Sequence, residues 1–269
     1  MIQKRGKRSD RMSGGVKPRR FVIAVAVAVV CQIAFLSAYQ TILAEHYAWR
    51  AQNAAAAKKP QYASAWAKRS LAVNPHQGYA AFFAGLTQSG KDQTTATAQV
   101  FQRALRTMAH RAQPLRELAS CEEKSGDHAE AARHLAEALA IEPIPTGNPA
   151  TPRAELGRLL FGLGRWADGI VQFRMAAADA PASRVGFDGL AVGYQHFGAL
   201  EPAVASAFAL LGSPQHVARA STHLSRLWAS AAQKPLIVAV LKEMQSALQA
   251  ADPRRSTIED LMKTAVAGQ

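Results

Sequence analysis

The sequence lacks most of the features that identify β-rich, metal-binding or catalytic proteins. It has no Asn-Gly hairpin turn and no sustained alternation of β-branched residues, so strands are not expected. Its only cysteines, Cys31 and Cys121, are about 90 residues apart, and Cys31 lies in an apolar segment. An internal disulfide is therefore not expected, and no metal-ligand spacing exists. The sequence also has no G-x-S-x-G, no phosphate-binding loop and no H-E-x-x-H.

The histidines do not form a ligand set along the sequence. His128 and His134 are six residues apart, so they do not share a helix face. His216 and His223 are seven apart and could share one, but no acidic residue or cysteine accompanies them. We therefore expect surface or interface histidines, no catalytic residue, no cofactor, no metal and no small-molecule substrate. The protein is not expected to be an enzyme.

Alanine and other helix-forming residues dominate the composition. Hydrophobic residues make up 49% of the chain and aromatic residues only 7%. Because alanine is the best helix former and lets helices approach closely, the composition predicts an all-α protein.

The positive charge is concentrated at the N-terminus. The formal net charge is +13, and residues 1–20 contain eight Lys or Arg against one acid, Asp10. Such a tail is able to bind nucleic acid, but a nucleic-acid binder would need a basic stripe outside the tail, and none is expected. Because an apolar segment follows, we expect the tail to lie on anionic lipid, at about 1 kcal/mol per basic residue.

The segment from Phe21 to Ala44 carries no charge. As a helix these residues would extend roughly 36 Å, enough to cross a hydrocarbon core of about 30 Å. Tyr39 and Trp49 would be interfacial anchors. Two alternatives are a buried helix of a soluble protein and a cleaved signal peptide. The run is longer than a usual signal peptide and ends in Ile42-Leu43-Ala44 rather than an A-x-A site. The pair Arg19-Arg20 also leaves a twin-arginine export signal open.

Flanking charges predict the orientation. Eight basic residues precede the apolar run, and three follow within about 15 residues. The positive-inside rule therefore places the N-terminus in the cytoplasm and residues 45–269 outside it. A bacterial inner membrane with a periplasmic domain fits this composition best.

Residues 112–143 resemble a tetratricopeptide repeat (TPR), a 34-residue helical hairpin with small and large apolar residues at fixed positions. With Pro143 at position 32, only Glu122 departs, because a tyrosine is usual there. Gly126 falls at the turn between the helices. The residues that match are Leu115, Leu118, Ala119, Ala131, Leu135 and Ala138.

Further units extend the resemblance over roughly residues 44–250. Unit 150–181 fits well except for Arg153 at position 4, and unit 184–214 fits moderately, with turns at Gly164 and Gly198. Units closing at Pro75 and containing Gly85 and Phe101 are weaker. The resulting division is a basic tail at 1–20, a transmembrane helix at 21–44, an α-solenoid of five to six hairpins at 45–253, and a capping helix or tail at 254–269. Ser256 or Thr257 is expected to cap this last helix.

The resemblance also implies where a partner binds. The first helix of each hairpin lines the groove of such solenoids, and positions 2, 5, 9 and 12 are expected to face it. Gln113 and Ser120 belong to this set. The residues that we predict to contact a partner are Tyr79, Phe82, Arg116, Glu123, Arg158, Phe161, Asp188 and Gln195.

Two functions follow from this reading. The first is a scaffold or adaptor at the inner membrane that binds other proteins of an envelope assembly or secretion machine. The second is a holdase-like chaperone for exported proteins, which would need an extensive exposed apolar groove. The repeat pattern is specific to the fold and does not distinguish between them.

Overall fold

A computed structural model describes residues 18–89, 94–145, 150–227, 234–249, 251–252 and 254–267. Most of the basic tail, residues 1–17, lies outside the described residues. Within the described residues the chain is helical, and two 3₁₀ turns, Pro181–Ser183 and Pro214–His216, join longer helices. The α-helices are α1 Pro18–Ala56, α2 Pro60–Val73, α3 Gly78–Ser89, α4 Thr94–Leu105, α5 Ala112–Lys124, α6 His128–Ile141, α7 Ala150–Gly162, α8 Trp166–Asp179, α9 Val185–His196, α10 Leu200–Leu210, α11 Val217–Leu227, α12 Lys234–Ala247 and α13 Arg254–Ala267.

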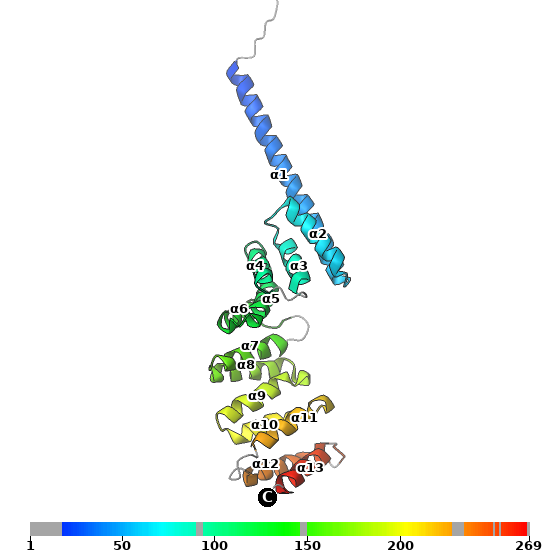
Figure 1. The fold of residues 1–269 in the computed structure, drawn as a ribbon, viewed down its shortest axis with the longest axis vertical. Coiled ribbons are helices and arrows are strands. Elements are labelled where there is room, and N and C mark those ends of the chain that lie inside the picture. Colours follow the sequence, from blue (N-terminus) through cyan, green and yellow to red (C-terminus); the bar gives the residue numbers. More distant parts are fainter. Residues whose placement is uncertain are drawn as a thin grey trace, which may run out of the picture.

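Successive helices pair as hairpins and stack into a solenoid (Figure 1). The expected all-α repeat architecture is confirmed. Three turn glycines, Gly126, Gly164 and Gly198, have φ of 87°, 75° and 66°, a conformation that glycine adopts without steric cost. Lys58 fills the equivalent turn between α1 and α2 with a φ of 55°. The three glycines have the same turn geometry and lie at the predicted turn positions, so the predicted alignment of these repeats agrees with the structure.

The two halves of the long helix α1 have different surroundings. Residues 22–42 are exposed and project away from the solenoid (Figure 1). From Ala44 onward the same helix packs against α2, with Ala44 and Ala51 fully buried. The Ser70 hydroxyl of α2 donates a hydrogen bond of 2.7 Å to the Ala44 carbonyl. The apolar run therefore continues without a break into the first hairpin.

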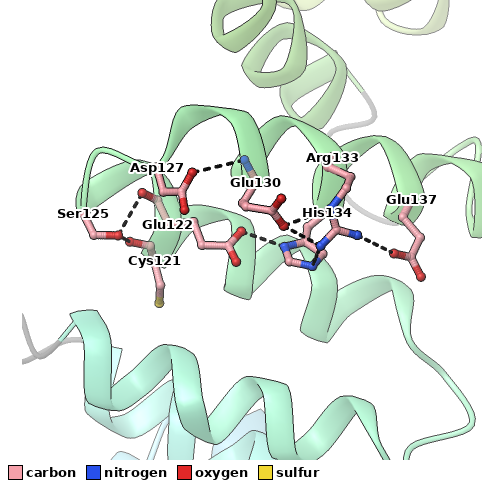
Figure 2. A network of polar contacts seen from close by, with 8 residues as sticks. All are labelled: Cys121, Glu122, Ser125, Asp127, Glu130, Arg133, His134 and Glu137. Carbon is pink, nitrogen blue, oxygen red and sulfur yellow. Dashed lines mark hydrogen bonds and ion pairs between the residues drawn. The ribbon is translucent and has the colours of Figure 1, made fainter.

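The departure at Glu122 is explained by a polar contact inside one hairpin. Glu122 on α5 points toward His134 on α6, and Oε2 lies 2.7 Å from Nδ1 (Figure 2). Both side chains are only 12% exposed. The pair ties the two helices together at a position where the repeat usually places a tyrosine.

Arg153, the other departure, attaches the irregular connection before α7 to the second hairpin helix. Its side chain is buried, with Nε 2.5 Å from Asp179 Oδ2 on α8 and Nη2 donating to the Pro143 carbonyl at 2.6 Å. The arginine thus links three segments, α7, α8 and the chain that leaves α6.

Close approach of α7, α8 and α9 depends on glycines around one ring. The buried Phe173 ring of α8 lies between Gly157 on α7 and Gly189 on α9. A Cβ at Gly157 would lie 2.7 Å from the ring, and one at Gly189 only 2.1 Å from it. Larger residues at these positions would force the helices apart.

The C-terminal helices close the solenoid. α11 packs on α9 and α10, whereas α12 packs on α10 and α13. Ile237, Leu241 and Ile258 are fully buried in this terminal core. The last helix begins at Arg254 rather than after Ser256 or Thr257, so the predicted cap is wrong. The Asp252 side chain instead accepts a hydrogen bond of 2.9 Å from the Arg254 backbone N–H.

Candidate partner-binding groove

The first helices of the first three hairpins surround a cavity of about 720 Å³. α1 contributes Trp49 and Gln52, which are one turn apart. The cavity begins at Glu45, directly after the apolar run. It therefore opens next to the exposed half of α1. The remaining lining residues are Ala48, Gln77, Tyr79, Phe82, Phe83, Thr107, Met108, His110 and Gln113.

The two predicted aromatic residues of this cavity differ in accessibility. Phe82 is only 3% exposed, because its ring packs against Phe83 and Phe101 at centroid distances of 5.4 and 5.9 Å. It lines the cavity, as its position in the repeat predicted, but as a buried wall rather than a free surface. Tyr79 is partly exposed, and Trp49 is 58% exposed. The accessible aromatic surface of the cavity is thus Trp49 and Tyr79.

A second cavity of about 250 Å³ follows along α5, between α5 and α7. Arg116, Glu117, Ser120 and Glu123 line it from α5, and Glu155 lines it from α7. Gln113 of the first cavity lies one helical turn before Glu117, so α5 joins the two cavities. Positions 2, 5, 9 and 12 of this repeat all lie at the joined groove. Whether they contact a partner stays a prediction.

Burial changes the acidity of two carboxyl groups in the second cavity. Desolvation raises the pKa of Glu117, although Arg116 and Lys124 partly offset it. Desolvation also raises the pKa of Glu155, and the nearby negative charge of Glu123 raises it further. These carboxylates are incompletely compensated, which makes this part of the groove favourable for a cationic group.

The predicted arginines of the groove are paired. Arg158 Nη2 of α7 lies 2.6 Å from Glu123 Oε1 of α5, so a residue of the next repeat pairs with a residue that lines the second cavity. Arg116 Nη1 lies 3.1 Å from Glu142 Oε2. Arg158 remains 61% exposed and able to exchange its partner, whereas Arg116 is 19% exposed.

The distal predicted residues Phe161 and Gln195 lie outside the two cavities. Phe161 is partly buried and packs against Trp166 and Phe173, at centroid distances of 4.6 and 5.1 Å. Gln195 is partly buried on α9. Neither residue lines the two cavities described above.

Asp188 pairs with α11. Its Oδ1 lies 2.8 Å from His223 Nε2, and its Oδ2 lies 3.2 Å from Arg219 Nη1. The hydrogen bond from His223, and then the neighbouring positive charges, lower the pKa of Asp188. Sequence reasoning missed this acidic partner of His223 because the two residues are 35 positions apart.

The first two hairpins carry an excess of basic residues, which was not predicted from the sequence. Between residues 46 and 110 the chain has eight Lys or Arg and one acid, Asp92. From residue 111 onward, 16 basic and 16 acidic residues balance. Among the described residues, every ion pair starts at or beyond Arg111. The first two hairpins therefore carry an excess of positive charge, although no contiguous basic stripe of the kind that binds nucleic acid is shown by this count.

Structural comparison defines the class: the chain is a TPR-like helical-repeat protein. No protein-family model matches the sequence, and no curated protein shows significant similarity. The chain is similar to the crystal structure of MamA, with 15% identity and a TM-score of 0.51 over 58% of this chain and 89% of MamA. It is also similar to YrrB, described as "a TPR protein with an unusual peptide-binding site", with 18% identity and a TM-score of 0.52 over 66% of this chain and 84% of YrrB. At these identities the likeness establishes the fold alone.

Proposed function

We propose that this protein is a single-pass scaffold of a bacterial inner membrane. Its N-terminus lies in the cytoplasm, and its TPR-like domain binds other envelope proteins in the periplasm. The observation that carries the proposal is the position of the groove on α1. One continuous helix supplies both a long exposed apolar segment and a wall of the cavity of about 720 Å³. The groove residue Gln52 is eight positions beyond Ala44, an axial rise of about 12 Å.

The packing around Ala44 favours a retained anchor over a cleaved signal peptide. A signal peptide is cut at the end of its apolar region, so the residues before the cut do not belong to the mature fold. Here the residues that end the apolar run are helical, and Ala44 is fully buried beneath α2. The hydrogen bond from Ser70 also holds the Ala44 carbonyl within the folded hairpin.

The groove suits an extended segment of a membrane protein. Trp49 and Tyr79 offer aromatic surface close to the apolar segment, and Glu117 and Glu155 offer carboxylates one to two turns further along. A segment that directly follows a transmembrane helix would enter at this height with apolar side chains and reach the acidic cavity with a lysine or arginine. The peptide-binding site named for YrrB is a precedent for this mode on the same fold.

The distribution of exposed apolar residues favours a scaffold over a holdase. A holdase would present a broad apolar groove. Phe82 and Phe83 are buried instead. The described exposed large apolar residues beyond α1 lie outside both cavities: Tyr62, Ile141, Ile144, Leu163, Val171, Met175, Phe197 and Leu236.

The native cysteines provide a test of the anchor. Cys31 lies in the exposed apolar half of α1, and Cys121 is buried. In proteoliposomes containing the C121S variant, Cys31 should resist a membrane-impermeant maleimide, whereas a cysteine at exposed Asn53 (N53C) should react. In spheroplasts, N53C should be labelled from outside and S13C should not. Labelling of Cys31 as fast as N53C would overturn the anchor, and labelling of S13C alone would reverse the orientation.

Photo-crosslinking tests the groove. Crosslinkers at Tyr79, Gln113 and Arg158 should capture one or two envelope proteins, with the crosslinked peptides adjoining a transmembrane segment. A crosslinker at Gln172, which lies in a different cavity between α6 and α8, is the matched control. Capture of many unrelated unfolded proteins would support the chaperone instead. Capture of cytoplasmic proteins alone would refute the proposed location.

A further inference from the structure

A cluster of cations and aromatic rings lies on the seam between α1 and α2. The rings of Tyr47 and Trp66 stack at a centroid distance of 5.7 Å. The guanidinium carbons of Arg50 and Arg69 lie 4.7 and 4.6 Å from the centre of the Trp66 ring. Lys68, next to Arg69 on α2, is also exposed. We call these five residues the collar.

The positive charge of the collar is not compensated within the described residues. No acid occurs between residues 46 and 89, and Glu45 is the only one in the first hairpin. Arg50, Lys68 and Arg69 make no ion pair or side-chain hydrogen bond among the described residues. Two guanidinium groups held against one indole repel each other unless an anion lies near, so the collar favours an anionic ligand.

The collar lies at the height of lipid headgroups if α1 crosses the membrane. The contact between Ser70 and Ala44 aligns α2 with the end of the apolar run. Trp66 is four residues from Ser70, so it lies about 6 Å beyond this end. The headgroup layer extends about 5 to 7 Å beyond the hydrocarbon on each side. The other repeats extend away from the apolar half of α1 (Figure 1), so the first hairpin is the part best placed to reach this layer.

We propose that the collar binds the phosphate groups of anionic lipids in the leaflet from which α1 emerges. Trp and Tyr prefer the membrane interface, and arginine donates paired N–H groups to phosphate. The inference rests on the proposed anchor. It concerns the opposite side of the membrane from the N-terminal tail, and it adds a second attachment that limits tilting of the solenoid.

The test uses the full chain in nanodiscs, labelled with 5-fluorotryptophan. The four tryptophans give separate ¹⁹F signals, and loss of one signal in W66F assigns Trp66. Replacing phosphatidylcholine stepwise by phosphatidylglycerol should shift the Trp66 signal to saturation. Removing two charges in R50Q/R69Q should weaken this response by roughly 30-fold, at about 1 kcal/mol for each charge.

A matched variant separates position from charge. K58Q/K59Q removes the same charge at the turn between α1 and α2, roughly 15 Å further from the membrane than Trp66, and should leave the response unchanged. R50K/R69K should restore most of the affinity, and circular dichroism should show equal helicity for all variants. A response lost equally in K58Q/K59Q, absent from the wild type, or produced by inorganic phosphate without phosphatidylglycerol would overturn the proposal. If Cys31 is protected from maleimide in the same preparation, such a failure concerns the collar and not the anchor.

Discussion

Replacing Gly189 by alanine tests the close packing of α8 and α9. A Cβ at this position would lie 2.1 Å from Phe173 Cδ1 and 2.2 Å from Cε1. Ordinary carbon contacts are about 3.5 to 4.0 Å, so the ring or the helix would have to move by more than about 1 Å. The ring cannot move freely, because it is 5% exposed and Gly157 borders it from α7.

The expected magnitude is the difference between two opposing effects. Overpacking a buried site costs about 1 to 3 kcal/mol, whereas Gly to Ala inside a helix gains about 1 kcal/mol. Because a Cβ at Gly189 would lie only 2.1 Å from the ring, the cost should fall in the upper part of this range, about 2 to 3 kcal/mol, and we expect G189A to destabilise the solenoid by roughly 1 to 2 kcal/mol. For a domain of this size that lowers the melting temperature by about 2 to 8 °C. The measurement is thermal unfolding of the full chain in detergent, followed by circular dichroism.

G162A is the matched control. Gly162 is also helical, but a Cβ there would have no neighbour within 4 Å, so the substitution should be neutral or slightly stabilising. The smaller residue in F173L should partly relieve G189A in a double-mutant cycle. A G189A protein at least as stable as the wild type would refute the tight packing of these helices.

Two further predictions concern the polar contacts between helices. R153M leaves Asp179 and the Pro143 carbonyl without their partner. It should lower the free energy of unfolding, measured by chemical denaturation, by roughly 2 to 4 kcal/mol. This loss is somewhat smaller than for a fully buried pair because Asp179 is 21% exposed. R165M breaks an exposed pair and should cost less than about 1 kcal/mol, so equal losses would contradict the structural role of Arg153. Asp188 has a lowered pKa, so its stabilisation is present above its unfolded pKa of about 3.9 and is lost as the pH falls through the lower folded value. The difference in melting temperature between the wild type and D188N should therefore shrink below about pH 4, whereas a constant difference would show that ionisation of Asp188 does not matter.

The sequence predicted the hairpins because repeat periodicity is a local signal. Positions such as Leu118, Ala131 and Ala138 recur at helical spacing, and a glycine with positive φ follows each well-formed first helix. The register alone also placed Gln113 and Ser120 at the two cavities.

The rest depended on three-dimensional contacts. Phe82 has the sequence position of a groove residue, but its side chain is buried because it packs against the large ring of Phe101 from the next helix. Asp188 and His223 are brought together by packing of α9 on α11. The excess of positive charge on the first two hairpins was not predicted, because the basic residues are scattered over 46–110 rather than gathered in one run.

Helix α1 is continuous and has no hinge. It therefore fixes the direction in which the groove faces, as well as the distance of the groove from the apolar segment. Each residue of an α-helix turns the chain by about 100°, so the groove faces one direction relative to the sides of the apolar segment. A neighbouring transmembrane helix that packs on one side of that segment would always meet the same side of the solenoid. One residue inserted between Leu36 and Ile42 would rotate the whole repeat domain by about 100° while leaving every hairpin intact. If α1 is a membrane anchor as proposed, this fixed angle would determine which membrane neighbours can reach the groove.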